Sequence, residues 1–348
     1  MDRNILVYRL GSIGDTILSL PAFHLARRSF PDAKFTLLTN MPVGQNAAPV
    51  EQVLENTGLV DEVLKYRLGL RRLRRLWSLR SEIAKQKFDA IVYITESRGL
   101  FKSVRDYLFF LLCGISRIIG VPFRKGDLHS LEVPGTGLYL WEAERMAGCL
   151  RELGVVDLSQ DEWWDLKLTA PEENEAEQLL HDSGISLGFI GASVGAKSSA
   201  KDWTDANWLV FIKKLSALYP THELVLVGSA YERERSEDLL TAWNGRKANL
   251  CGLSTPRVSA ALLKRAKVFV GHDSGPMHLA GVVGTPCVAI FSARNLPGKW
   301  YPRGKNNTIL YHQTFCYGCQ LDVCNDYMKH CILSISVEDA LNAIRTYL

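Results

Sequence analysis

A short turn near the start of the chain combines two glycines with an aspartate, in Gly11-Ser12-Ile13-Gly14-Asp15. One apolar run ends directly before this turn and another begins directly after it. Paired glycines are typical of phosphate-binding loops, but the spacing lacks the complete G-x-G-x-x-G pattern, and a carboxylate repels a phosphate. Gly11 and Gly14 instead favour a tight turn whose backbone comes close to a substrate. The turn therefore presents the carboxylate of Asp15 rather than an anion-binding cradle.

A second turn, in the segment GHDSGPMH at 271–278, follows an apolar run typical of a strand. Its proline suits the first turn of a helix, so Ser274 and Gly275 are expected to present free N–H groups at a helix N-terminus. Such a terminus can bind a diphosphate. The alternative is an ordinary capped turn with Asp273 or Ser274 as the N-cap. His278, one turn into the helix, either reaches a phosphate or is a structural histidine.

Two polar loops follow predicted strands in the same part of the sequence. Lys201 lies in the loop after the strand predicted at 187–190, and Glu232 follows the strand predicted at 223–227. A lysine at a strand's carboxyl end either neutralises a phosphate or is a solvated surface residue. A glutamate there either accepts hydrogen bonds from ribose hydroxyls or favours the start of a helix.

Four cysteines lie within sixteen residues, as Cys316-x2-Cys319-x4-Cys324-x6-Cys331. Such a density of thiols suits a tetrahedral zinc or iron site, although the spacing is tighter than in common zinc motifs. Two interpretations stay open: a structural metal that braces a loop, or a compact loop of reduced thiols. The other four lie in apolar surroundings and are predicted to be buried small hydrophobes: Cys113, Cys149, Cys251 and Cys287.

A basic segment at 65–80 (KYRLGLRRLRRLWSLR) has seven basic residues and no acidic one. Its leucines and Trp77 recur at helical spacing. A basic amphipathic helix either lies on an anionic membrane surface or meets a phosphorylated acceptor, and the alternative is a solvated helix packed on the sheet by its leucines. Arg98, Lys102 and Arg105 could extend the same surface.

Short apolar runs alternate with amphipathic stretches of helix length, which predicts parallel sheets with helices on both faces. Strands are predicted at 5–9, 34–39, 90–95, 187–190, 223–227, 267–270 and 288–291. Helices are predicted at 16–29, 172–182, 205–219, 232–243, 258–266 and 337–347, and two more are expected to begin near Leu70 and at Pro276.

The alternation weakens between about 135 and 177, so we predict two Rossmann-like domains, at 1–168 and 169–336. The C-terminal helix, 337–348, is predicted to pack on either domain, including back on the first. Ligands bind at the carboxyl ends of the strands in such domains, so two of them create a cleft that favours an enzyme with two substrates. A periplasmic-type binding protein is disfavoured because the sequence begins without a signal peptide.

The 348 residues carry a net charge of +4, too small to indicate nucleic-acid binding by itself. The longest apolar stretch, 107–119, is interrupted by Arg117 and is too short to span a bilayer. We therefore expect a cytoplasmic protein.

The sequence resembles glycosyltransferase family 9, the heptosyltransferases of lipopolysaccharide core synthesis. GSIGDTILSLPA at 11–22, KDW at 201–203, GSAYE at 228–232 and HDSGPMHLAG at 272–281 occur in the family's order. The resemblance implies a GT-B fold, with an N-terminal acceptor domain and a C-terminal nucleotide-sugar domain facing each other across a cleft. It also implies inverting transfer of a heptose from ADP-heptose to a lipid A-linked inner-core acceptor at the inner membrane.

The resemblance assigns roles to individual residues. Asp15 matches the proposed catalytic base, Lys201 matches a lysine near the donor phosphates, and Glu232 matches an acidic contact to the ribose. The diphosphate-binding turn is matched by Asp273, Ser274, Gly275 and His278. Those donor groups would stabilise the leaving diphosphate, so no cofactor is expected to be required, and a metal-binding DxD pair is not evident.

Two other functions stay open on the sequence. One is a GT-B transferase that uses a different nucleotide sugar or a protein acceptor. The other is a non-catalytic sugar-nucleotide-binding protein, against which the position of Asp15 argues.

Overall fold

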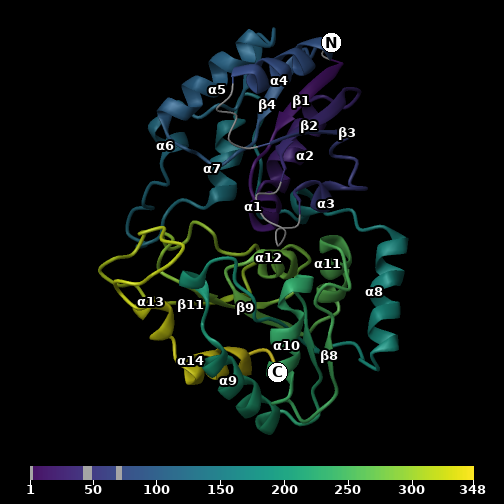
Figure 1. Ribbon diagram of the computed structural model, residues 1–348, viewed down its shortest axis with the longest axis vertical. Coiled ribbons are helices and arrows are strands. Elements are labelled where there is room, and N and C mark those ends of the chain that lie inside the picture. The colour runs from purple at the N-terminus through teal and green to yellow at the C-terminus, as the bar shows by residue number, and fades with distance from the viewer. Residues whose placement is uncertain (1–2, 42–48, 68–72) are drawn as a thin grey trace. The chain divides into compact units, whose positions relative to one another are not determined.

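The structure, a computed structural model, describes residues 3–41, 49–67 and 73–348 (Figure 1). The chain divides into two compact units, Met1–Lys167 and Leu168–Leu348. Each unit is a layered α/β structure built on one parallel sheet. In the described ranges, no helix has the length and hydropathy needed to cross a membrane.

The first unit is built on a sheet in the order β3-β2-β1-β4-β5, in which all neighbouring strands are parallel. Its central strand has a continuous apolar run, and Ile5, Leu6 and Val7 are fully buried, as expected for a parallel strand covered on both faces. The strands are β1 (Asn4–Tyr8), β2 (Lys34–Asn40), β3 (Glu62–Tyr66), β4 (Ala90–Tyr93) and β5 (Arg117–Ile119).

Helices of the first unit cover both faces of this sheet. Leu79 and Ile83 of α4 and Phe110 of α5 pack on one face with side chains of β1 and β4. The predicted helix at 16–29 is two helices, because Ser19 ends the first and a proline near the start of the second cannot continue the backbone ladder. The helices are α1 (Ile13–Leu18), α2 (Leu20–Ser29), α3 (Glu51–Leu54), α4 (Leu73–Lys85), α5 (Leu100–Leu112), α6 (Lys125–Leu128), α7 (Glu142–Cys149) and the 3-10 turn η1 (Asp161–Trp164).

The second unit repeats the design with a parallel sheet in the order β11-β10-β9-β6-β7-β8. Alternate residues of its central strands pack with α9, α10 and α14 in one apolar cluster, to which Trp203, Trp208 and Trp243 contribute. The strands are β6 (Ile190–Ser193), β7 (Leu224–Leu226), β8 (Lys247–Asn249), β9 (Val268–His272), β10 (Cys287–Phe291) and β11 (Thr308–Tyr311).

The helices of the second unit include α8, whose N-cap Thr169 forms a capping box with Glu172 just after the boundary between the units. The helices are α8 (Ala170–Asp182), α9 (Asp205–Leu218), α10 (Arg233–Leu240), α11 (Pro256–Lys264), α12 (Gly275–Val282), α13 (His330–Leu333) and α14 (Val337–Arg345), with 3-10 turns η2 (Ser199–Lys201) and η3 (Ala230–Glu232). The sequence left open where the last helix packs; α14 lies against α9 and β10, within this unit.

Several sequence-based boundaries are wrong. Strand β4 ends at Tyr93 rather than at 95, and α10 ends at Leu240 rather than at 243. The first strand of the second unit includes Gly191-Ala192-Ser193 and begins at Ile190, because residues 187–188 precede it as a turn. Strand β9 extends through His272. The basic segment 65–80 is not one helix: its first two residues end β3 and α4 begins at Leu73. Residues 68–72 of that segment, with the predicted helix start near Leu70, lie outside the described residues.

Candidate functional site

The turn that contains Asp15 lies where ligands bind in an open α/β sheet. Strand order in the first unit reverses between β1 and β4, and the carboxyl end of β1 leads directly into the turn and α1. Such a switch point leaves a crevice at the carboxyl edge of the sheet. The fold therefore places the carboxylate of Asp15 at that edge.

Asp15 is tied to its own turn. The backbone N–H and the hydroxyl of Ser12 donate to Asp15 Oδ2, at 2.5 and 2.6 Å. Among the described residues, Oδ1 accepts no hydrogen bond. Gly11 has a φ of +136°, and a Cβ there would lie 2.8 Å from both Cβ and Oδ2 of Asp15. The glycine is thus needed both for its backbone conformation and for the space that the aspartate occupies.

Arg9, two residues before Gly11, is a buried cation beside this turn. Arg9 is 1% exposed, and its Nη1 donates to the carbonyl oxygen of Ile94 at 3.2 Å. Its Nε and Nη2 have no partner in the described part of the chain. Burial lowers the pKa of Arg9, and the charges of Asp15, Glu142 and Glu96 oppose that shift. Sequence reasoning missed Arg9, which at the end of a strand has no signal that separates it from a surface arginine.

Two of the three cations expected to extend the acceptor surface are already paired. Arg98 and Arg105 both form ion pairs with Asp106, a buried residue of α5. Tyr93, at the end of β4, donates its hydroxyl to the same carboxylate at 2.9 Å. Lys102 is exposed on α5. Arg98 and Arg105 therefore brace the start of α5 as well as lying on its surface.

The second unit brings Lys201 and Asp273 together, although they are far apart in the sequence. Strand order reverses here between β6 and β9, and these residues lie on the loops that follow those two strands. Lys201 Nζ is 2.6 Å from Asp273 Oδ2 and also donates to the carbonyl oxygen of Asp273 at 3.2 Å. Burial opposes ionisation of Asp273, but the charges of Lys201 and His278 hold its pKa well below the usual range.

The N-terminus of α12 adds polar atoms that lack partners. The hydroxyl of Ser274, at the N-cap, and Nδ1 of His278 are buried and accept or donate no hydrogen bond among the described residues. His278 Nε2 lies 3.8 Å from Asp273 Oδ1. Buried polar atoms are normally paired, so these two atoms mark a place where a ligand would complete the hydrogen bonding.

Asn295 belongs to the same cluster, and sequence reasoning missed it. Its side-chain amide donates to Asp273 Oδ2 at 2.8 Å, from the loop after β10. The carbonyl oxygen of Asn295 in turn accepts from Tyr311, at 3.1 Å. An asparagine that lies so far along the chain from its partner carries no local signal in the sequence.

His272, the last residue of β9, holds the loop that contains Lys201. Trp203 N–H donates to His272 Nε2 at 3.0 Å, so Nδ1 carries the ring proton and donates to the carbonyl oxygen of Gly195, also at 3.0 Å. Burial lowers the pKa of His272 to about 4, against the effect of the Gly195 hydrogen bond. The histidine is neutral and fixes both ends of the loop.

Glu232 is packed against the ends of β6 and β7. Its Oε2 accepts from the backbone N–H and the hydroxyl of Ser229, at 2.6 and 2.9 Å. A Cβ at Gly195 would lie 1.4 Å from Glu232 Oε1, and a Cβ at Gly228 would lie 2.6 Å from Oε2. The two glycines therefore make room for this carboxylate beside the loop that carries Lys201.

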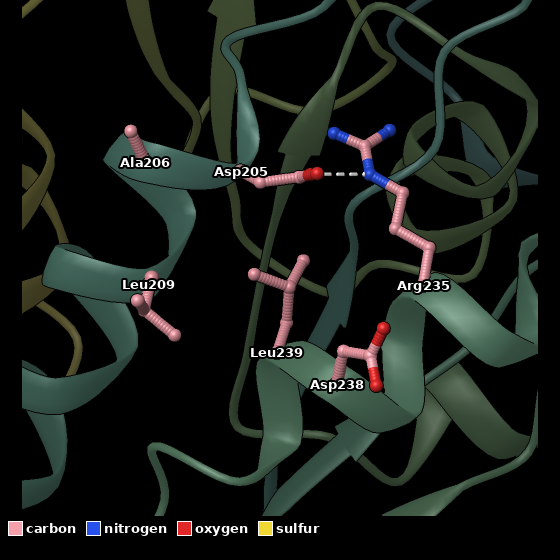
Figure 2. A pocket seen from close by; sticks show the side chains of 6 residues that line it. All are labelled: Asp205, Ala206, Leu209, Arg235, Asp238 and Leu239. Atoms are coloured by element: carbon pink, nitrogen blue, oxygen red, sulfur yellow. Dashed lines mark hydrogen bonds and ion pairs between the residues drawn. The ribbon is translucent and has the colours of Figure 1, made fainter.

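A surface pocket of about 240 Å³ lies between α9 and α10 (Figure 2). Arg235 projects across it and donates from Nε to Asp205 at 2.6 Å, and its Nη2 pairs with Asp202 at 2.9 Å. The other lining residues are Ala206, Leu209, Asp238 and Leu239. None of the predicted site residues lines this pocket. Its ion pairs do fix the position of Asp202, which directly follows Lys201 in the sequence.

The four clustered cysteines are not arranged as a metal site. They line one small pocket with Tyr327 and His330. Within the described residues, no three His, Cys, Asp or Glu side chains are placed to hold one ion, and all eight cysteines are free thiols. Cys331 is buried with its Sγ 3.4 Å from Ser292 Oγ, whereas Cys319 is exposed. The described positions therefore offer no set of three ligands for zinc or iron, and the choice between a structural metal and reduced thiols stays a prediction.

Comparison with known proteins identifies related sequences. The family model described as "Glycosyltransferase family 9 (heptosyltransferase)" matches residues 142–329. Lipopolysaccharide heptosyltransferase 2 of Salmonella typhimurium is 28% identical over 177 residues, which cover 48% of this chain and only 50% of that relative. Lipooligosaccharide heptosyltransferase 2 of Campylobacter jejuni is 23% identical over 341 residues, covering 97% and 95%.

A solved structure shares the fold over the whole chain. The Escherichia coli structure described as ADP-heptose lps heptosyltransferase II superposes with a TM-score of 0.69 at 20% identity, covering 99% of this chain and 98% of that one. Together with the two parallel α/β units, this likeness confirms the predicted GT-B fold class.

Proposed function

Because the chain belongs to glycosyltransferase family 9 and is a glycosyltransferase, we propose that it transfers a heptose from ADP-heptose to a lipopolysaccharide inner-core acceptor linked to lipid A. The relatives named above are heptosyltransferases of lipopolysaccharide or lipooligosaccharide. In this proposal the first unit binds the acceptor and the second binds the nucleotide sugar, in the cytoplasm and at the inner-membrane surface.

The observation that carries the proposal is the cluster in the second unit. Lys201 is oriented by Asp273, and Ser274 and His278 each hold a buried polar atom without a partner among the described residues, at the start of α12. A diphosphate oxygen bound here would accept from the hydroxyl of Ser274, the N–H of Gly275 and the remaining ammonium proton of Lys201. Helix N-termini and cations bind such anions.

Asp15 is the proposed general base. In an inverting transfer the acceptor hydroxyl attacks the anomeric carbon on the face opposite the leaving diphosphate. Asp15 would take the proton of that hydroxyl through Oδ1, since Oδ2 is held by Ser12. The pair of bonds to Ser12 fixes the carboxylate, so that no rearrangement is needed before the proton moves.

Negative charge develops on the diphosphate as the bond between the anomeric carbon and the diphosphate oxygen breaks. Lys201 and the N–H groups of α12 would stabilise that charge from fixed positions. Glu232 would accept hydrogen bonds from the ribose hydroxyls with Oε1, because Ser229 already donates to its Oε2. Asp273 and Asn295 act as positioning residues that hold Lys201 in place.

The test is transfer from ADP-heptose to a purified lipid A–inner-core acceptor, with NMR assignment of the new anomeric centre. Transfer with inverted configuration is the expected result, and retention would overturn the mechanism. Thermal shifts with ADP, UDP and GDP distinguish the donors. Stabilisation by UDP or GDP but not by ADP would indicate a UDP- or GDP-sugar in place of ADP-heptose. Donor binding without transfer to any acceptor would contradict the assignment of this activity.

A further inference from the structure

Helix α5 exposes a continuous apolar face to solvent. Six of its side chains, with exposures from 38% to 83%, share this face: Leu100, Phe101, Val104, Leu108, Leu111 and Leu112. They follow the three- and four-residue spacing of one side of a helix. The opposite side of α5 packs inward through Ser103, Asp106 and Phe110. We call the six exposed residues the α5 stripe.

Helix α4 continues the apolar surface at one end of the stripe. The two helices lie side by side in the first unit (Figure 1). Arg80 of α4 donates from Nε to the carbonyl oxygen of Leu112 at 2.8 Å, and its guanidinium lies 5.5 Å from the ring of Trp77. Trp77 is 58% exposed. An aromatic side chain with an arginine beside it thus adjoins the last turn of α5.

The surroundings of the stripe are basic. Arg74 and Arg75 are exposed on α4, and Lys102 and Arg105 lie on α5. The acidic residue of α5, Asp106, is buried and paired with arginines. On the described part of α4 and α5, the exposed acidic residue is Glu82. Cationic side chains therefore outnumber anionic ones along both helices.

A second apolar side chain with basic neighbours joins this face from another segment. Phe123 follows β5, is 44% exposed, and packs edge-on against Tyr107 of α5 with ring centroids 5.5 Å apart. The next two residues, Arg124 and Lys125, are exposed. The combination of apolar and basic side chains is therefore a property of the surface and not only of one helix.

Water is a poor partner for this face, because soluble proteins rarely expose contiguous apolar patches of this kind without a binding role. A second copy of the chain would bring like charges together in a two-fold contact. Crossing a bilayer is excluded for α5 by its 13 residues, about 20 Å of helix. An anionic lipid surface satisfies both the apolar stripe and the surrounding cations.

We propose that the α5 stripe docks the first unit on an anionic lipid bilayer, with its apolar side chains in the acyl boundary and the surrounding arginines and lysines at the headgroups. This inference deepens the proposed function, on which its biological meaning rests. Helix α5 begins at the carboxyl edge of the first sheet, where Asp15 also lies, so docking brings that edge to a surface that holds a lipid-linked acceptor.

The test is co-sedimentation of the full chain with anionic vesicles of mixed phosphatidylcholine and phosphatidylglycerol, and with neutral vesicles of phosphatidylcholine alone. The wild type is expected to bind the anionic vesicles, and to bind them more weakly as salt is raised from about 0.1 to about 0.5 M, since screening weakens the electrostatic attraction. The variant Phe101→Gln/Leu108→Gln/Leu112→Gln is expected to lose roughly tenfold or more in affinity.

A matched control makes the same kind of change in the second unit. Leu209, Val210 and Leu218 are 44–51% exposed on α9, but they point to different sides of that helix. Their triple change to Gln is expected to leave vesicle binding unchanged. Both triple variants need to keep the wild-type thermal midpoint, which exposed positions allow.

A second variant tests the charges alone. It is expected to leave the folded state intact, because every apolar side chain stays in place. Arg74→Gln/Arg75→Gln is expected to weaken binding to anionic vesicles about fivefold for each charge removed. Equal binding to neutral and anionic vesicles, or equal binding by stripe and control variants, would overturn the proposal. Loss of a dimer in the stripe variant, with no vesicle binding by the wild type, would assign the face to self-association instead.

Activity separates this proposal from the proposed function. The stripe variant is expected to keep wild-type turnover on a delipidated, water-soluble acceptor and to lose rate only on acceptor in vesicles. Vesicle binding without any transfer would support the docking surface and contradict the assignment of heptose transfer. Transfer without vesicle binding would support heptose transfer and contradict the docking surface.

Discussion

Each unit has an aspartate in the element that joins a central strand to a helix, but the two aspartates make different contacts. In the first, the aspartate lies inside the helix, at the third position of α1, and its contacts come from its own turn. In the second, the aspartate precedes α12 and is neutralised by Lys201 and bonded by Asn295. Among the described residues, Asp15 Oδ1 accepts no hydrogen bond, which fits the proposed base, whereas Asp273 is paired with Lys201, which fits the proposed anion site.

The difference lies in what surrounds each turn rather than in the turn itself. A helix N-terminus favours any negative charge. In the first unit a side chain supplies that charge, so a phosphate is not needed. In the second unit the charge of Asp273 is cancelled by a lysine, and the helix N-terminus stays available. Substitutions that change the charge at either turn therefore test this difference directly.

The largest effect is expected from Asp15→Asn. Removing the base is expected to lower kcat about 10²- to 10⁴-fold while leaving the donor Kd unchanged, because donor binding is assigned to the second unit. Steady-state kinetics and calorimetric titration with ADP would measure the two quantities. Unchanged turnover in a folded variant would remove Asp15 from the mechanism.

The chain supplies a matched control for that change. Ser336 is the N-cap of α14, and its backbone N–H and hydroxyl both donate to Asp339 Oδ2 at 2.8 Å, the same arrangement as Ser12 with Asp15. Asp339→Asn is expected to cost about 0.5–2 kcal/mol of capping stability, as Asp15→Asn does, with no loss of turnover. An equal fall in kcat in both variants would assign the effect to capping.

Lys201→Met is expected to have the next largest effect. It leaves the buried charge of Asp273 without its cation, which costs about 3–5 kcal/mol when a buried pair is broken, and it weakens ADP binding. In Lys201→Met/Asp273→Asn, stability is expected to recover while ADP affinity stays low. Urea unfolding and titration with ADP would show this split.

The exposed ion pair between Lys264 and Glu173 provides the comparison for that result. Lys264→Met is expected to cost at most about 1 kcal/mol, as for other surface pairs. A double variant that recovered both stability and ADP affinity would exclude Lys201 from the donor site.

An acid dependence is expected from His272. Its folded pKa of about 4 lies below the ordinary value, so the unfolded chain takes up a proton first and stability falls as the pH drops below about 6.5. Between pH 7.5 and 5 this costs about 2 kcal/mol. Urea unfolding of His272→Gln is expected to lack this slope, and the exposed His181→Gln is expected to keep it. Equal slopes in all three proteins would contradict a neutral, buried His272.

The smallest effect is expected from a change in the loop between Gly195 and Trp203, which carries Lys201. In Gly195→Ala the new Cβ would displace Glu232, and we expect ADP affinity to fall by roughly tenfold, the cost of one lost hydrogen bond to a charged group. Gly148→Ala in α7, whose Cβ would make only an ordinary contact with Arg151 Nη2 at 3.9 Å, is expected to be neutral or to gain up to about 1 kcal/mol. Unchanged ADP affinity in Gly195→Ala would argue against a ribose contact by Glu232.

Sequence reasoning predicted the fold class and both turns, because glycine, proline and buried strands leave strong local signals. It missed β3, β5, β8 and β11, which are short or half-exposed and therefore have weak apolar patterns. It also missed α5, whose outer face is apolar where a soluble helix is normally polar.

The partners within the site were less predictable than the turns. Asn295 reaches Asp273 from the loop after a different strand, and Arg9 is identified only by its burial. Such contacts depend on tertiary structure, which no local pattern records. The cysteine cluster shows the converse, since its spacing suggested a metal that the described positions of its thiols do not support.

The histidine at the end of β9 has a kinetic consequence. By bonding to Gly195 at one end of the loop and to Trp203 at the other, His272 fixes the segment that carries Lys201. A loop fixed in this way has already lost the conformational entropy that ligand binding would otherwise remove. Nucleotide association is then expected to follow a single exponential whose rate constant rises linearly with concentration, without a saturating closure step.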